Sequence, residues 1–324
     1  MQFGLLIPGG PKWMPGTSRE TYVADTRRVL DRIEGVFDSV WMVDHFWINE
    51  LDCFECWTTL SFFAGLYPGL RFGSMVLCNS FRNPGLLAKM AATLQCLTDG
   101  RLILGIGAGW NEAEYRAFGY DFPRAGTRID QLDEALQVIT SLWHEPSSTF
   151  AGRHYQLVDA RCDPKPPLPP TLLVGGRGRR TIQLAARYAD WWNADWVPAD
   201  TYRELSQQVT SACVSEGRDP ATIRRTWLGV CSCAPTLEAA QDAMAGGVPE
   251  RPGNALVGTP SQIVDGLAPF VDAGMDYWIM TPPRVPDAAA LDLLTDELLP
   301  QVRARYAGPD ELRAADRRTP SSTA

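Results

Sequence analysis

The sequence predicts an α/β fold, a closed parallel (β/α)8 barrel of the TIM-barrel type. Short apolar segments alternate along the chain with longer amphipathic ones, the pattern of parallel strands connected by helices. Eight such strand segments precede residue 281, and a length of 324 residues suits one closed barrel. Glycine-rich or charged segments directly follow several of these strands, where such barrels carry their functional loops.

The first half of the chain supplies four strands and four helices. We expect strands at residues 2–7, 39–43, 71–77 and 102–106, and helices at residues 19–33, 53–67, 86–97 and 127–143. Asn83 and Pro84 form a cap and a first-turn proline for the third helix, and Asp99-Gly100 stops it. The order strand, helix, strand therefore repeats from the first residues.

The second half begins with an excursion over residues 146–170, where the periodicity breaks and five prolines fall within residues 164–170. A short strand pair is expected within it, around residues 150–158. Further strands are expected at residues 172–174, 191–194, 226–233 and 277–280, with helices at residues 181–188, 201–214, 260–271 and 291–302. Thr259 opens the third of these helices with a capping box, and Pro300 bends the last. We expect residues 1–307 to form one domain and residues 308–324 to be a disordered tail.

Composition narrows the class of protein. The net charge of −8 and pI near 5.0 argue against a nucleic-acid partner, which needs a basic surface. No stretch of about 18 apolar residues and no basic leader is present, so we expect a soluble cytoplasmic protein without a membrane partner. Eight cysteines and three histidines show no zinc-protease or paired CxxC pattern, which disfavours a metal enzyme. The apolar helix over residues 53–67 is compatible with a homodimer.

The turn from Gly175 to Arg180 has the outline of an anion site. Glycines let a backbone approach a phosphate, N–H groups at a helix start point towards it, and arginines add charge-assisted bonds. Taken alone, the segment is equally well explained as a left-handed turn beside a solvated basic face. Its place after a predicted barrel strand, beside the other strand exits, favours the anion site.

Four strand exits together resemble those of the bacterial luciferase-like flavin and deazaflavin oxidoreductases. The likeness covers residues 2 to about 282 and is specific as a set, although each motif alone is weak. The motifs are Asp44-His45, residues 76–84 leading into residues 87–94, residues 100–112, and Gly175-Gly176-Arg177-Gly178.

Within this family the pattern is most similar to the branch that binds coenzyme F420, a deazaflavin with a phosphate and an acidic oligoglutamate tail. The resemblance implies that Asp44 and His45 border the ring, and that Cys78 and Asn111 contact the cofactor. It implies that Gly175, Gly176 and Gly178 hold the phosphate. A cis peptide near Met75-Val76 would support the ring, which places Val76 in the cofactor site. Arg177, Arg179 and Arg180 would form a cationic lip for the acidic tail.

One departure concerns a glutamate. In the sugar-phosphate dehydrogenase of this branch, a glutamate follows the counterpart of Gly107 and works with the histidine, whereas this chain has Ala108. This disfavours sugar-phosphate oxidation. Glu112 is the nearest candidate carboxylate, and we interpret it as a solvated residue of the next helix.

His45 is the candidate proton donor or acceptor, because a histidine of ordinary pKa, about 6.5, serves as acid or base at neutral pH. Trp47 and Trp110 are the candidates for an apolar substrate pocket, although aromatic residues of this kind also pack rims and cores. Cys78 lacks a recognisable partner histidine, which favours cofactor contact over a nucleophilic role. Asn111 is equally well explained as a turn residue.

These observations lead to one hypothesis and three rivals. The first is an F420-dependent oxidoreductase that transfers hydride between the deazaflavin and a small, partly apolar organic substrate. The second is an FMN-dependent luciferase-like monooxygenase. The third is a flavin or deazaflavin carrier without catalysis, and the last is an unrelated phosphosugar-binding barrel.

Overall fold

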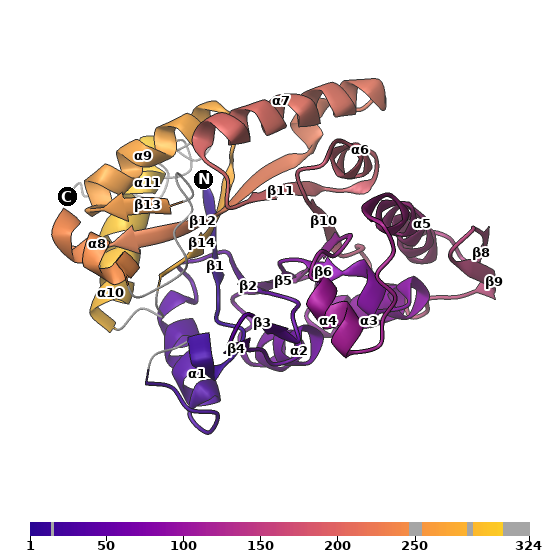
Figure 1. Cartoon of the computed structure of the whole chain (residues 1–324), viewed down its shortest axis with the longest axis horizontal. Coiled ribbons are helices and arrows are strands. Elements are labelled where there is room, and N and C mark those ends of the chain that lie inside the picture. The colour runs from indigo at the N-terminus through magenta and orange to yellow at the C-terminus, as the bar shows by residue number, and fades with distance from the viewer. Residues whose placement is uncertain (14–15, 246–254, 284–287, 307–324) are drawn as a thin grey trace, which may run out of the picture.

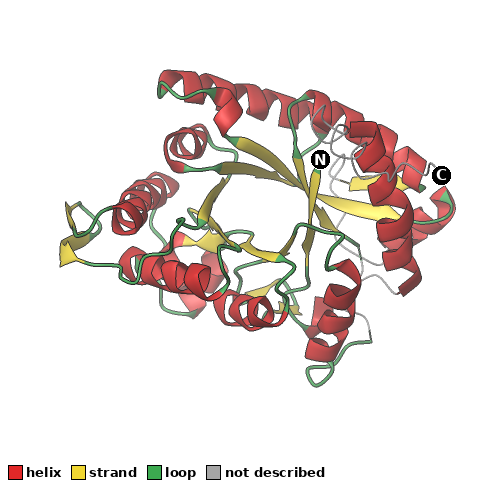
Figure 2. Ribbon diagram, turned by 180° about the vertical axis from the view of Figure 1, so that it is seen from behind, coloured by secondary structure: helices red, strands yellow, loops and turns green. Residues whose placement is uncertain are grey.

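The principal sheet of the computed structural model closes into a parallel barrel, which confirms the predicted fold class (Figures 1 and 2). The structure describes residues 1–13, 16–245, 255–283 and 288–306, so the prediction of a disordered tail over residues 308–324 lies outside the described residues. Within them, eight strands run parallel around the barrel. Pairing of β7 (Leu102–Gly107) with β10 (Thr171–Gly175) closes it. These strands are β1 (Gln2–Leu6), β2 (Ser39–Met42), β5 (Arg71–Ser74), β7 (Leu102–Gly107), β10 (Thr171–Gly175), β11 (Trp191–Asp195), β12 (Arg224–Cys233) and β14 (Tyr277–Thr281).

Helices surround the barrel and cover its outer face (Figure 2). They are α1 (Tyr22–Ile33), α2 (Cys56–Leu66), α3 (Pro84–Leu97), α5 (Ala125–His144), α6 (Arg179–Tyr188), α7 (Ala199–Ser215) and α9 (Pro260–Asp272). The Asn83 side chain accepts from the backbone N–H groups of Gly85 and Leu86, as the predicted cap requires. The capping box of Thr259 and Gln262 is present at the start of α9.

The predicted strand at residues 71–77 is wrong as one continuous element. β5 ends at Ser74, the Met75-Val76 peptide bond is cis, and pairing resumes in β6 (Leu77–Cys78), which lies beside the end of β7. The cis bond stands where the resemblance implies it.

The last helix also differs from the prediction of one helix bent at Pro300. It consists of α10 (Ala288–Asp292), a π-helical segment (Leu293–Leu298) and α11 (Leu299–Tyr306). Proline lacks an N–H and its ring crowds the carbonyl four residues earlier, and the wider turns before Pro300 accommodate both constraints.

Several short elements decorate the barrel. The predicted excursion is an antiparallel hairpin, β8 (Ser148–Ala151) with β9 (Gln156–Ala160), which projects beyond α5 (Figure 1). The antiparallel pair β3 (Trp47–Ile48) and β4 (Leu51–Asp52) follows β2, and α4 (Glu112–Ala117) follows β7. Sequence reasoning missed α8 (Leu237–Ala245) and β13 (Ala255–Gly258). β13 pairs in parallel with the end of β12, and α8 packs against both strands.

Apolar side chains pack in two layers, one between strands and helices and a smaller one inside the barrel. Inside, the Trp41 ring centroid lies 6.2 Å from that of Trp191 and 6.4 Å from that of Tyr277. Arg71 and Arg224 stand over the Trp191 ring at 5.2 and 4.9 Å. All but Trp41 begin their strands, so they fill the amino-terminal opening of the barrel.

The exposed surface includes apolar side chains on α2, where Phe62 is 50% and Leu66 44% exposed. They do not test the homodimer, which stays a prediction. None of the helices in the described ranges combines the length and the apolar character needed to cross a membrane.

Candidate active site

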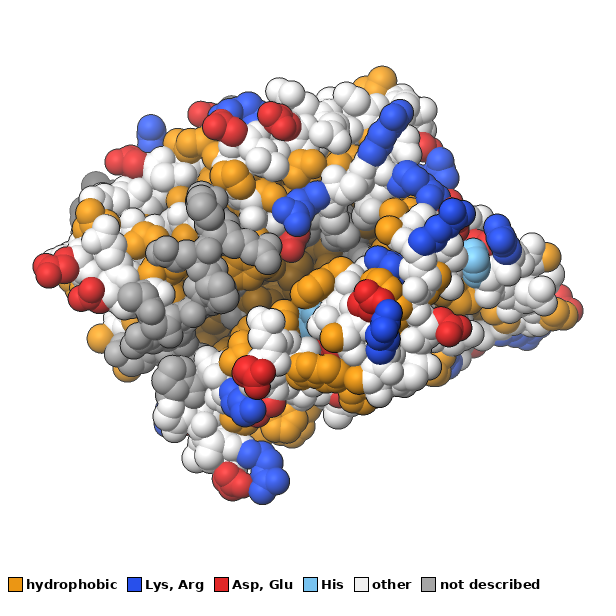
Figure 3. Space-filling view, viewed as in Figure 1, with side chains coloured by type: hydrophobic (Ala, Val, Ile, Leu, Met, Phe, Trp, Pro, Cys, Tyr) orange, Lys and Arg blue, Asp and Glu red, His pale blue; other side chains and the backbone are white. Residues whose placement is uncertain are grey.

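The predicted site residues follow the carboxyl ends of neighbouring strands at one rim of the barrel. His45 follows β2, Cys78 ends β6, and Gly107 ends β7, while Gly175 ends β10. The register places Cys78 opposite Gly107, and Val174 opposite Ile106. The structure therefore brings together exits that lie more than a hundred residues apart in the sequence. On this face a hollow lined by hydrophobic side chains opens (Figure 3).

Val76 lies where three exits meet. A Cβ built on Gly107 or Gly175 would stand 2.9 Å from a Val76 methyl group, and one on Gly105 would stand 3.2 Å away. These distances are shorter than ordinary van der Waals contact. The absence of side chains at these glycines therefore gives Val76 its place between β7 and β10.

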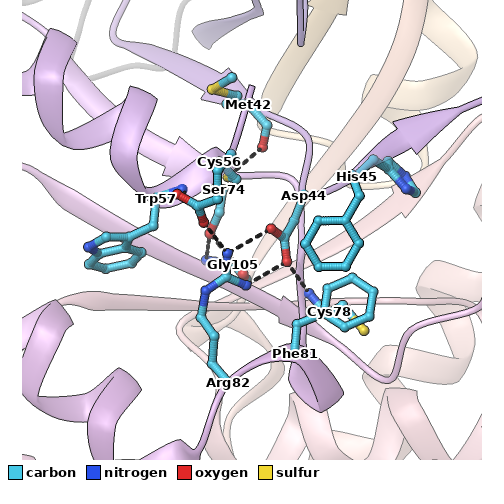
Figure 4. A network of polar contacts seen from close by, with 12 residues as sticks. Met42, Asp44, His45, Cys56, Trp57, Ser74, Cys78, Phe81, Arg82 and Gly105 are labelled. Carbon is cyan, nitrogen blue, oxygen red and sulfur yellow. Dashed lines mark hydrogen bonds and ion pairs between the residues drawn. The ribbon is translucent and has the colours of Figure 1, made fainter. Parts of the chain in front are cut away.

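The Asp44 carboxylate ties the exit of β2 to that of β6. It accepts bonds of 2.7 and 2.9 Å from the Arg82 guanidinium and one of 2.8 Å from the backbone N–H of Cys78 (Figure 4). Arg82 also pairs with Glu55 at 2.5 Å. Burial opposes the charge of Arg82, but the hydrogen bonds and charge of Asp44 outweigh it and raise the Arg82 pKa. Both Asp44 oxygens are thus engaged by this chain, and its contact with a cofactor stays a prediction.

His45 points away from Asp44 (Figure 4) and pairs instead with Glu114 of α4. Nδ1 of His45 lies 2.8 Å from Oε2 of Glu114, whose side chain is only 1% exposed. The His45 side chain is 15% exposed, and its ring stands edge-on to Trp110 at 5.7 Å. His45 therefore has one nitrogen held by the protein and a ring that reaches the surface of the site.

Sequence reasoning missed Glu114 and named Glu112 instead as the nearest carboxylate. Glu112 is exposed and pairs with Arg116 on the same helix, as expected of a solvated residue. A signal was available, because Tyr115 and Phe118 are apolar residues at helical spacing and Glu114 lies on the face that they define.

Cys78 and Asn111 also lie at this rim. The Cys78 sulfur lies 3.0 Å from the Tyr115 hydroxyl, and burial raises the pKa of the thiol to about 11. It is therefore a protonated thiol at neutral pH. Asn111 is the N-cap of α4, but its side chain makes no capping bond. A turn role explains its backbone, and the side chain is available for a ligand.

The glycine turn after β10 has the features of an anion site. Gly176 adopts a φ of +146°, a conformation that favours glycine, and its carbonyl accepts from the indole N–H of Trp192 at 2.9 Å. Gly178 caps α6 without any side-chain bond, so the first N–H groups of the helix are left to other acceptors. An anionic group fits this donor set.

The three arginines of the turn differ in their partners. All are exposed. Arg180 pairs with Asp130, and Nε of Arg177 lies 3.8 Å from Asp195. Arg179 has no carboxylate partner among the residues that the structure describes. The cationic lip stays a prediction, and among the described residues Arg179 is the arginine of the turn whose charge no carboxylate compensates.

Aromatic side chains border the site beside His45. Phe46 stacks on Phe118 with the ring centroids 3.9 Å apart, and the ring centroid of Trp47 lies 5.9 Å from that of Phe118. Trp110 is 65% and Phe118 56% exposed. Exposed aromatic faces beside a polar group are suited to a partly apolar ligand. In the described ranges, no three His, Cys, Asp or Glu side chains gather closely enough to hold a metal ion.

Comparison with known proteins gives one family match. The model of the family described as "Luciferase-like monooxygenase" matches residues 1–252. An F420-dependent glucose-6-phosphate dehydrogenase from Kineococcus radiotolerans is 33% identical over 195 residues, so the chain spans 58% of that relative's length and the match covers 58% of this chain. A protein of the same description from Amycolatopsis mediterranei is 26% identical over 305 residues, 82% of this chain and 90% of the relative.

Among solved structures, an F420-dependent secondary alcohol dehydrogenase in complex with an F420-acetone adduct has the same fold. Its TM-score is 0.80 at 22% sequence identity, and the superposition covers 93% of this chain and 99% of that one.

Proposed function

Because the chain belongs to the luciferase-like monooxygenase family, we propose that it is an oxidoreductase that transfers hydride between coenzyme F420 and a small, partly apolar organic substrate. Relatives described as F420-dependent support the choice of cofactor. The observation that carries it is Arg179, a cation without a carboxylate partner in the described part of the chain, which stands at the uncapped start of α6 in a protein of net charge −8. An acidic tail requires such a cation, whereas FMN offers only a phosphate.

The residues of the rim divide into a phosphate end and a ring end. Gly176, Gly178 and the first N–H groups of α6 would hold the phosphate, with Arg179 and Arg177 beside it. Val76 and Cys78 would border the ring on the side of β6. The bound deazaflavin would supply the hydride-accepting or hydride-donating carbon.

His45 would move the proton that accompanies hydride transfer. Its ring is partly exposed beside Trp110, while Glu114 holds Nδ1. The exposed aromatic border would orient an apolar part of the substrate and exclude water from the reacting carbon. The resemblance described above aligns Ala108 with a glutamate of the sugar-phosphate dehydrogenase, so we propose a substrate other than a sugar phosphate.

An FMN-dependent monooxygenase is the second candidate, and one observation favours it. Arg180 and Arg177 already have carboxylates near them, so the charge available for an acidic tail is smaller than the sequence indicates. A site for FMN would need only the glycine turn and the start of α6.

Fluorescence titration separates the candidates. We expect saturable quenching of F420 at micromolar protein and weaker quenching of FMN, followed by reduction or oxidation of bound F420 in a screen of alcohols and ketones. Preferential binding of FMN would transfer the assignment to the monooxygenase. Binding of neither ring would contradict both. Unchanged turnover in His45→Ala would exclude His45 as the proton carrier, whereas binding without any turnover would indicate a carrier.

A further inference from the structure

Glu114 contacts His45, and its two carboxylate oxygens have different kinds of partner. Oε1 accepts from the backbone N–H groups of Phe46 and Trp47, at 2.6 and 3.3 Å. Oε2 lies 2.8 Å from Nδ1 of His45. The carboxylate therefore holds the backbone that follows β2 and the histidine side chain at the same time.

We infer that Glu114 is a positioning residue that fixes the tautomer of His45 and makes Nε2 the nitrogen that exchanges the proton. A carboxylate can only accept hydrogen bonds, so Nδ1 must carry a hydrogen in both the neutral and the charged ring. In the neutral ring, Nε2 is then the nitrogen that carries no hydrogen. The same arrangement of carboxylate, histidine and reacting group orients histidine bases in other enzymes.

The catalytic part of this inference rests on the proposed function. When an alcohol is oxidised, its O–H bond breaks and the proton passes to Nε2 of His45. The bound deazaflavin would supply the acceptor for the hydride of the adjacent carbon, and the carbon–oxygen bond would become a carbonyl. In the reverse direction Nε2–H donates the proton to the carbonyl oxygen. The tautomer itself does not depend on the identity of the cofactor.

Glu114→Gln is a sharp test because the backbone determines how the new amide must lie. The N–H groups of Phe46 and Trp47 can only donate, so they require the amide oxygen. The amide NH2 then faces Nδ1, which must accept, and the hydrogen of the neutral ring moves to Nε2. The substitution changes the tautomer while it preserves the size of the side chain.

Nitrogen-15 NMR of the cofactor-free protein reads the tautomer directly. The chain has three histidines, and His45→Gln identifies the His45 signals. His144 is an internal reference, because its Nδ1 lies 2.8 Å from the Thr140 carbonyl and must also donate. We expect Nδ1–H with an unprotonated Nε2 for neutral His45 in the native protein, and the opposite in Glu114→Gln.

Turnover provides the second measurement. We expect Glu114→Gln to lower kcat/KM by about 10²- to 10⁴-fold, the range for losing acid–base catalysis, with cofactor affinity within about twofold of native. Glu112→Gln, two positions away and exposed, is the matched control and should leave both the His45 signals and turnover unchanged.

A native spectrum in which neutral His45 has Nε2–H and an unprotonated Nδ1 would overturn the inference, even if Glu114→Gln fails to fold. An unchanged tautomer or unchanged kcat/KM in a folded Glu114→Gln would also overturn it. Failure of the protein to bind either cofactor would instead contradict the proposed function and leave the tautomer result standing, so the two failures are distinguishable.

Discussion

Nδ1 of His45 and Oε2 of Glu114 lie 2.8 Å apart although 69 positions separate the two residues in the chain. The contact joins the segment after β2 to the helix after β7, so two strand exits share one buried carboxylate. Asp44, the neighbour of His45, makes a second such connection through Arg82 and the backbone of Cys78. Consecutive residues at the end of β2 are thus anchored to different parts of the rim.

Asp44→Asn should destabilise the fold. The Asp44 and Arg82 side chains are only 5% and 12% exposed, and the substitution would leave the buried Arg82 guanidinium with Glu55, whose side chain is 42% exposed, in place of two carboxylates. We expect a loss of about 3 kcal/mol in the free energy of unfolding, measured in urea. Glu112→Gln breaks an exposed pair and should change it by less than about 0.5 kcal/mol. Equal effects of the two variants would show that the Asp44 pair is not structural.

Gly175→Ala should displace Val76, because the added Cβ would stand 2.9 Å from its methyl group. We expect a loss of about 1–3 kcal/mol in stability and weaker cofactor binding. Val76→Ala in the same chain should restore part of the stability. The control is Gly65→Ala, on an exposed part of α2 with open space, which should be neutral or stabilise by about 0.5 kcal/mol. No recovery in the double variant would rule out the contact with Val76 as the cause.

Arg179→Gln should weaken F420 binding about tenfold, the equivalent of one charge-assisted hydrogen bond of ~1.5 kcal/mol. FMN binding should weaken less, because FMN has no acidic tail. Titrations at two salt concentrations check the charge effect, which should shrink as salt rises. Arg187→Gln, at the other end of α6 and paired with Glu216, is the matched control. Equal losses with both cofactors would place Arg179 at the phosphate alone.

Cys78 should resist alkylation at pH 8. Burial raises the pKa of its thiol to about 11, so only about one molecule in a thousand carries the thiolate at that pH. Mass spectrometry after iodoacetamide treatment should show labelling of the exposed Cys96 well before Cys78. The Cys78 rate should rise with pH towards 11 in folded protein. Rapid labelling at pH 8 would revive a nucleophilic role for this residue.

Local patterns were sufficient for the barrel and for much of its rim. Asn83 and Thr259 were recognisable as caps because a cap needs only residues within one helical turn. The glycine turn after β10 was recognisable for the same reason, since it depends on Gly176 and on the start of one helix.

Contacts between distant segments were not recoverable in this way. Arg82 looks like a surface charge in the sequence, and the helical spacing around Glu114 does not identify its partner. Only the closure of the barrel brings these residues to Asp44 and His45. Compensation of Arg180 by Asp130 likewise depends on the packing of α6 against α5. β13 has four residues and α8 has nine, four of them alanine, so neither gave a clear periodic signal.

Arg71 and Arg224, which stand over the Trp191 ring, fill the amino-terminal opening and leave the strand exits as the open mouth of the barrel. For the proposed function, substrate and product would therefore enter and leave at the strand exits. Changes of substrate during evolution can then be confined to the loops of that mouth, while the opposite end continues to serve stability alone.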